Sequence, residues 1–181
     1  MEIKIIRTGF LNENCYLLIK NNECLIIDPG ADFFNIKKEL KNLNIVAVLI
    51  THRHFDHIGA LNELINTYEV NVYDKSNLKE GSKTINSFTF ETIYTPGHSS
   101  DSISFYFKNE NAIFVGDFIF KNSIGRWDLE TGNKKELETS LQLFIDRFKR
   151  QNNLIIYPGH GEYTTYNSEI NNNPFLDGLN K

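Results

Sequence analysis

The spacing of apolar and polar positions along the chain predicts where its strands and helices lie. Three early segments are rich in aliphatic residues and separated by Asn- and Gly-containing turns. We expect strands over Glu2–Arg7, Asn14–Lys20 and Cys24–Asp28. Asn21-Asn22 is the expected hairpin tip between the last two. The continuous apolar run Ile45–Ile50 predicts a strand that is buried on both faces.

A helical spacing of apolar residues follows in other parts of the chain. Phe33–Leu43 is expected to be a helix with Asp32 as its N-cap, and Lys134–Arg150 a helix capped by Asn133. We expect another helix over Ile58–Thr67, a short one after Thr165, and short strands over Val70–Tyr73, Phe88–Thr95, Ser102–Lys108, Ala112–Val115 and Leu154–Tyr157. An antiparallel group of strands followed by alternating strands and helices predicts an α/β protein with helices outside its sheets.

Composition and charge narrow the class of protein. With 181 residues, 40% of them hydrophobic, the chain is expected to form one globular domain over residues 1–181. A net charge of −4 without a long basic run argues against nucleic acid as a partner, and the absence of a long apolar segment argues against a membrane. Cys15 and Cys24 lie in apolar runs, which favours two buried thiols in a cytoplasmic protein over a disulfide.

The histidines are distributed in a pattern that points to chemistry. Three of the five, His52, His54 and His57, fall within six residues, and Asp56 lies among them. His98 and His160 each follow a Gly at the end of a predicted strand, and Asp117 ends another. The competing interpretation is that these are separate surface or core residues, with the glycines needed only for turns.

Metal binding accounts for this pattern better, because neutral imidazole is the commonest metal ligand and carboxylates complete its coordination. Residues two apart in an extended loop project to the same side, so His52 and His54 can hold one ion. Asp56 and His57 lie where the loop turns into a helix and can reach a second ion. The absence of Cys from the cluster favours an open catalytic site over a structural zinc site.

These motifs resemble the metallo-β-lactamase-fold hydrolases. The resemblance covers Thr51–His57, which has the H-x-H-x-D-H form, together with Pro96-Gly97-His98, Gly116-Asp117 and Pro158-Gly159-His160-Gly161. It implies an α/β fold of the α+β kind, a four-layer αββα sandwich with a dinuclear metal site at one edge of its two sheets. It also implies two divalent ions per chain, with zinc expected and iron or manganese as alternatives.

The same resemblance distributes the ligands. His52, His54 and His98 would hold the first metal; Asp56, His57 and His160 would hold the second, and Asp117 would bridge the two. Asp28 has no ligand role in this scheme, and we expect it to be a buried acid that hydrogen-bonds the metal-binding loop.

Within the family, the glyoxalase II (hydroxyacylglutathione hydrolase) group is most similar, in particular its short bacterial members. The similar stretches are Gly9–Tyr16 and Gly125–Leu129. Only 21 residues follow His160, too few for the C-terminal helical domain that supplies glutathione contacts in typical members, and we therefore expect that domain to be absent. Ser100-Asp101 also departs from the Pro-Gly of many members.

The expected reaction is hydrolysis of a small thioester, S-lactoylglutathione or an ester of another thiol, by a metal-bridging hydroxide. A thiolate leaves without a dedicated acid, which favours thioesters over amides. Asp117 and Asp56 are the predicted catalytic residues, Asp56 either as a ligand alone or also orienting the nucleophile.

Three residues are predicted to contact substrate, and each has a second interpretation. Arg126 is either a carboxylate clamp or the partner of Asp128 in a salt bridge. Trp127 either lines the pocket or packs in the core. Phe10, with Leu11, is either an apolar lid or a plain hairpin tip.

Other functions are compatible with the same motifs. A mononuclear iron persulfide dioxygenase-like oxidoreductase shares most of them, because ligand identity does not fix the metal. A hydrolase of another ester or of a lactone, and a binding module that keeps the site for folding, are further alternatives.

Overall fold

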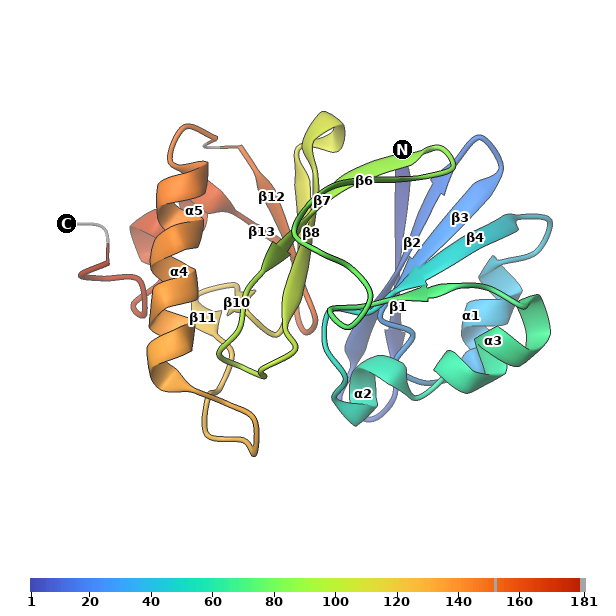
Figure 1. Ribbon diagram of the computed structural model, residues 1–181, viewed down its shortest axis with the longest axis horizontal. Coiled ribbons are helices and arrows are strands. Elements are labelled where there is room, and N and C mark those ends of the chain that lie inside the picture. The colour runs from blue at the N-terminus through green and yellow to red at the C-terminus, as the bar shows by residue number, and fades with distance from the viewer. Residues whose placement is uncertain (152, 180–181) are drawn as a thin grey trace.

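A computed structural model of the chain describes residues 1–151 and 153–179. Figure 1 shows two sheets side by side, with α4 and α5 outside one and α1 and α3 outside the other. The protein is therefore an α+β sandwich of four layers, as the sequence predicted. No helix in the described part of the chain combines the length and apolar character that crossing a bilayer would need.

The first sheet has the order β1-β2-β3-β4-β5 in the described residues. Neighbours are antiparallel from β1 to β3 and parallel from β3 to β5. Its strands are β1 (Glu2–Thr8), β2 (Glu13–Lys20), β3 (Glu23–Ile27), β4 (Asn44–Leu49) and β5 (Val72–Tyr73). The helices of this half are α1 (Phe33–Glu39), α2 (Phe55–Ile58) and α3 (Leu61–Tyr68).

The second sheet has the order β13-β12-β9-β8-β7-β6 in the same part of the chain. All neighbours are antiparallel except β12 and β9. Its strands are β6 (Gly81–Ile85), β7 (Phe88–Tyr94), β8 (Ile103–Phe107), β9 (Ala112–Gly116), β12 (Ile155–Pro158) and β13 (Thr164–Thr165). A small hairpin of β10 (Ile119–Phe120) and β11 (Ser123–Ile124), a 3-10 turn at Lys108–Glu110, α4 (Lys134–Phe148) and α5 (Tyr166–Asn172) complete this half.

In the residues that the structure describes, three apolar layers hold the sandwich together. One lies between the two sheets and contains Phe90, Phe105 and Phe114. A second joins α1 and α3 to the first sheet, and a third joins α4 to the second sheet. Cys15 and Cys24 are buried free thiols of the second layer, which confirms the prediction of no disulfide.

The helices of the first half differ from the prediction. Asp32 precedes α1 but adopts a left-handed backbone (φ 52°), and its side chain accepts a hydrogen bond from Gly9 N instead of capping the helix. The helix also ends at Glu39, short of Leu43. The helix predicted over Ile58–Thr67 is α3, which begins later, at Leu61, and ends at Tyr68. The separate helix α2 was not predicted, and Gly59 lies between the two helices, where a Cβ would lie 2.1 Å from Gly30 O.

The predicted cap of the long helix is confirmed, because the Asn133 side chain accepts a hydrogen bond from Glu136 N at 3.1 Å. That helix ends at Phe148, two residues before its predicted end. The strands β6, β10, β11 and β13 were not predicted. Three of them have only two residues, too few for a spacing pattern to be detected.

Candidate metal centre

Four segments that follow strands contribute the predicted metal ligands. The loop after β4 carries His52 and His54 and runs into α2, which holds Asp56 and His57. His98 follows β7, Asp117 follows β9 and His160 follows β12. The structure brings all seven side chains together, although they span more than half of the chain.

His52, His54 and His98 form the first group. His54 Nδ1 lies 3.1 Å from His52 Nε2 and 2.9 Å from His98 Nε2. Three ring nitrogens from two loops thus converge on one position, and these residues could hold one metal ion.

Asp56, His57 and His160 form the second group. His160 Nε2 lies 3.2 Å from Asp56 Oδ2, and His57 Nε2 lies 3.9 Å from the same oxygen. Asp117 lies between the two groups, with one oxygen 3.3 Å from His57 Nε2 and the other 3.6 Å from both His98 Nε2 and His160 Nε2.

Hydrogen bonds behind the cluster determine which way the imidazole lone pairs face. The Thr51 hydroxyl donates to Asp28 at 2.6 Å, so it must accept from His52 Nδ1, which lies 3.1 Å away. A neutral imidazole with its proton on Nδ1 presents the lone pair of Nε2, here toward His54. In the same way, Nδ1 of His98 donates to the Arg126 carbonyl at 2.8 Å.

His57 and His160 are held in the same manner. His57 Nδ1 donates to Asp28 Oδ2 at 3.0 Å, and His160 Nδ1 donates to the Leu11 carbonyl at 3.2 Å. Their Nε2 atoms therefore face the Asp56 and Asp117 carboxylates as acceptors facing acceptors. This is favourable only if protons or cations lie between them.

The electrostatics of the buried atoms agree with this requirement. His57 Nε2 and Asp117 Oδ1 are buried, and neither makes a hydrogen bond of good geometry with the described residues. Burial lowers the pKa of His57, but the nearby Asp28 and Asp117 carboxylates outweigh it and raise that pKa well above its usual value. The two carboxylates thus favour a positive charge beside His57, as a bound cation would supply. The nitrogen and oxygen donors of the cluster fit zinc, iron or manganese.

His52 is already prepared as a ligand. Burial, followed by the neighbouring His57 and His98, holds the pKa of His52 well below its usual value. The ring is therefore neutral at pH 7, as a metal ligand must be.

Asp28 lies where the sequence predicted a buried acid behind the metal-binding loop. One of its oxygens accepts from Thr51 N at 2.7 Å, and the other accepts from the Thr51 hydroxyl and from His57. The carboxylate thereby fixes the position of the loop and of one predicted ligand. That prediction is confirmed.

Asn14 and Glu13 also support the site, although neither was predicted to do so. The Asn14 amide donates to the carbonyls of Pro158 and Gly161, both at 3.0 Å, and so holds the turn that carries His160. Glu13 lies behind His57, where burial raises its pKa to about 9. Two buried polar residues opening an otherwise apolar strand were the available signal.

Two glycines allow the ligands to approach one another. A Cβ at Gly159 would lie 2.3 Å from Asp117 Oδ1, and one at Gly116 would lie 2.3 Å from Thr51 Oγ1. Gly116 also has a φ of +54°, which other residues adopt rarely. Larger side chains at either position would separate the loops that carry the cluster.

The predicted substrate contacts lie in different places. Arg126 lines the cavity over the cluster and forms a bidentate pair with Asp128, at 2.7 and 2.9 Å. Trp127 lies apart from the residues that line this cavity; it packs against the core under α4, as its second interpretation stated. Phe10 is 82% exposed and stacks on Phe55 at the rim.

Asp101, whose role the sequence left open, braces the metal-binding loop. It accepts from Arg53 N at 3.0 Å and from the Ser99 hydroxyl at 2.7 Å. The Arg53 side chain pairs with Asp74. Asp101 therefore links the loop that carries His98 to the loop that carries His52 and His54.

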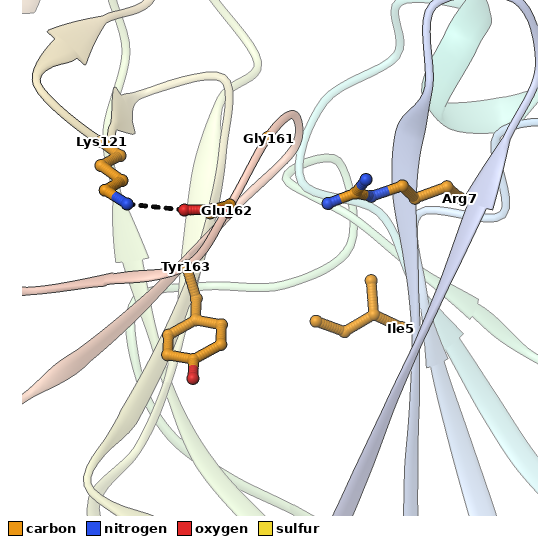
Figure 2. Close-up of a pocket in the computed structure, with 6 residues that line it drawn as sticks. All are labelled: Ile5, Arg7, Lys121, Gly161, Glu162 and Tyr163. Atoms are coloured by element: carbon orange, nitrogen blue, oxygen red, sulfur yellow. Dashed lines mark hydrogen bonds and ion pairs between the residues drawn. The ribbon is translucent and has the colours of Figure 1, made fainter.

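A groove lies beside the residues that directly follow His160, Gly161 to Tyr163. Figure 2 shows Lys121 paired with Glu162 on one side of it, with Tyr163 on that side, and Arg7 with Ile5 on the other. Lys121, which directly follows β10, thus lines this groove and is not among the residues that line the cavity over the cluster.

A four-layer αββα sandwich with a histidine- and aspartate-lined cluster at the strand ends defines a metal-dependent hydrolase scaffold. Residues 8–80 and 78–160 match the family described as the metallo-beta-lactamase superfamily. The chain belongs to this superfamily.

The chain is similar to known relatives and solved structures over nearly its full length. A probable metallo-hydrolase of Bacillus subtilis is 33% identical, with 99% of each chain covered. The hydroxyacylglutathione hydrolase GloC of Haemophilus influenzae is 28% identical, with 98% of this chain and 99% of that protein covered.

Among solved structures, the B3 metallo-beta-lactamase BLEG-1 matches with a TM-score of 0.91 and 34% identity, covering 98% of this chain and 100% of that one. ETHE1 from Myxococcus xanthus matches with a TM-score of 0.87 and 25% identity, covering 98% and 85%. TTHA1623, solved in a di-iron-bound form, matches with a TM-score of 0.86 and 28% identity, covering 96% and 100%.

Proposed function

We propose that this protein is a dinuclear metal-dependent thioester hydrolase of the hydroxyacylglutathione hydrolase type. The observation that carries the proposal is the set of inward-facing Nε2 lone pairs on His52, His57, His98 and His160, opposite the carboxylates of Asp56 and Asp117. Such a set of facing acceptors favours bound cations. The similarity to a hydroxyacylglutathione hydrolase supports the reaction type.

The ligand roles follow from the two groups of residues. His52, His54 and His98 would hold one metal and Asp56, His57 and His160 the other, with Asp117 between them. When bound, two divalent ions lower the pKa of a water molecule and polarise the carbonyl that it attacks. Zinc is the expected metal, with iron and manganese as alternatives.

The remaining residues of the cavity favour a leaving group that needs no acid. Apart from the proposed ligands, the cavity is lined by apolar residues, Ser123 and Arg126. None of these supplies a proton near pH 7. A thiolate departs without protonation because the pKa of its thiol is about 8.5, whereas an amine does not.

The Asp117 and Asp56 carboxylates have different proposed roles because they occupy different positions in the site. Asp117, which lies between the two groups, would hold the ions at a fixed separation. Asp56 is half-buried and reaches toward the cavity, so it would both ligate a metal and accept a hydrogen bond from the attacking water.

A persulfide dioxygenase-like iron oxidoreductase is the second candidate, because ETHE1, a persulfide dioxygenase, matches this chain with a TM-score of 0.87.

The metal content of the purified protein discriminates between the two candidate functions. We expect about two metal ions per chain and release of thiol from S-lactoylglutathione or a related thioester. One iron per chain with oxygen consumption on a persulfide, and no thioesterase activity, would overturn the proposal. Protein stripped of metal by a chelator is the control.

A further inference from the structure

The cavity over the cluster has apolar walls. It has a volume of about 680 Å³, and its floor consists of the proposed ligands His54, Asp56, His98, Asp117 and His160. Three separate segments supply the walls: the β1–β2 turn, the start of α2, and the stretch from β10 to residue 129. The wall residues are Leu11, Phe55, Phe120, Ile124 and Leu129.

The apolar surface continues onto the rim. Phe10 and Phe55 are 82% and 65% exposed, and their rings stack with centroids 6.2 Å apart and an interplanar angle of 19°. Leu11 is 44% exposed beside them. Adjacent exposed apolar side chains at the mouth of a cavity are typical of a surface that binds an apolar ligand.

Charged groups for recognition are few at the same place. Arg126 is the one Lys or Arg residue among those that line the cavity, and Asp128 already occupies its guanidinium. Arg53 pairs with Asp74, and Lys121 with Glu162 in the groove of Figure 2. The two carboxylates and the ammonium group of a glutathione moiety would therefore find little to pair with in this cavity.

We propose that the substrates of this site are thioesters with a hydrocarbon acyl group, chain or ring, and that the apolar walls bind this group while its carbonyl lies over the cluster. The inference rests on the proposed thioester hydrolysis. In this inference the binding free energy comes from transfer of the hydrocarbon acyl group out of water into the apolar cavity. A preference for lactoylglutathione would instead depend on recognition of the polar glutathione moiety.

The test is a chain-length series on the metal-loaded protein. Acetyl, butanoyl, hexanoyl and octanoyl thioesters of N-acetylcysteamine keep the thiol constant and uncharged. We expect kcat/KM to rise by up to about fourfold per methylene until the cavity is filled. The glutathione thioester of the same acyl group should be cleaved with a kcat/KM similar to that of the N-acetylcysteamine ester.

Wall variants show whether the cavity itself is responsible. Leu11→Ser and Leu129→Ser should lower the octanoyl-to-acetyl ratio of kcat/KM by about tenfold, since each removes apolar contact surface. Leu143→Ser is the matched control, because Leu143 is 63% exposed on α4 and does not line the cavity. Its ratio should match that of the unaltered protein.

The outcomes separate this inference from the proposed function. Hydrolysis of none of the N-acetylcysteamine and glutathione thioesters would show that the proposed function is wrong. Hydrolysis with a flat or falling chain-length series, or a strong preference for the glutathione ester, would overturn the inference and leave the proposed function in place.

Discussion

The inner and outer sides of the same cluster are built differently. On the inner side, Asp28, Thr51 and Asn14 are buried and make short hydrogen bonds to the loops that carry the predicted ligands. On the outer side, Phe10, Phe55 and the Arg126–Asp128 pair are exposed and touch no imidazole nitrogen through their side chains. The inner side therefore sets the geometry of the cluster, while the outer side determines what approaches it.

This difference predicts two kinds of variant. A substitution on the inner side, or at the centre, should change metal content and activity together. A substitution on the outer side should change KM or substrate preference and leave the metal in place.

The largest effect is expected at the centre, from Asp117→Ala. Its carboxylate lies within 3.6 Å of ring nitrogens in both ligand groups, so its loss leaves those nitrogens without a shared anionic partner. We expect metal content to fall from about two ions to one or fewer per chain, and thioester hydrolysis to fall to the rate of metal-free protein. Elemental analysis and thiol release measure the two quantities.

Asp146→Ala on the exposed face of α4 is the control for this variant. Unchanged metal content and turnover in Asp117→Ala would show that the carboxylate does not join the two groups.

Asp28→Asn tests the inner side without changing the size of the side chain. The amide cannot accept all three hydrogen bonds that the carboxylate accepts from Thr51 N, the Thr51 hydroxyl and His57. We expect metal affinity to fall about 10- to 100-fold, measured by competition with a chelator, with an unchanged circular dichroism spectrum.

Asp32→Asn is the matched control, because Asp32 lies four residues further on, is exposed and accepts one hydrogen bond, from Gly9 N. An equal loss of metal affinity in both variants would show that Asp28 supports the metal site no more than an exposed acid of the same loop does.

The inner side is also the part that the sequence predicts best. The metal-binding loop and the Gly-flanked histidines follow predicted strands, and Asp28 ends one; parallel strands such as β3 and β4 bring their ends to one edge. Residue chemistry indicated a metal site at strand ends, and the family resemblance implied which seven side chains meet there. The hydrogen bonds of Asn14 were not predicted, because they connect residues more than 140 positions apart.

The outer side was predicted less well for a physical reason. Arg126, Trp127 and Phe10 lie in loops, where neither periodicity nor spacing fixes the direction of a side chain. Arg126 and Trp127 are adjacent in the sequence, yet one lines the cavity and the other packs under α4. The pairing of β10 with β11, which places Phe120 and Ile124 in the wall, involves too few residues to leave a pattern.

Glu13 gives the inner side a pH dependence in the metal-free protein. Burial raises the pKa of Glu13 to about 9 from an ordinary value of 4.5. Between these two values the folded protein holds a proton that the unfolded chain has released, so the free energy of unfolding should fall as pH rises. The slope contributed by one such group approaches about 1.4 kcal/mol per pH unit.

Glu13→Gln should remove this slope, because the amide does not titrate. Urea unfolding between pH 5 and pH 9 measures the pH dependence of the free energy of unfolding in the metal-free proteins. The unaltered protein and Glu13→Gln are compared with Glu138→Gln, a control on the exposed face of α4. A slope that is the same in all three proteins would show that Glu13 is not the responsible group.

The smallest effect is expected on the outer side, from Asp128→Asn. Arg126 and Asp128 form an exposed bidentate pair, each side chain 62% accessible, and such a pair adds little to stability, so the melting temperature should barely change. The substitution frees the guanidinium for a substrate carboxylate. We expect KM for a thioester of 3-mercaptopropionate to fall about two- to threefold, with kcat and metal content unchanged. The N-acetylcysteamine ester, which lacks a carboxylate, should show no change in KM.

Arg126→Gln should raise KM for the 3-mercaptopropionate ester and not for the N-acetylcysteamine ester. If neither variant alters KM, Arg126 serves only its salt bridge, and recognition on the outer side depends on the apolar walls alone.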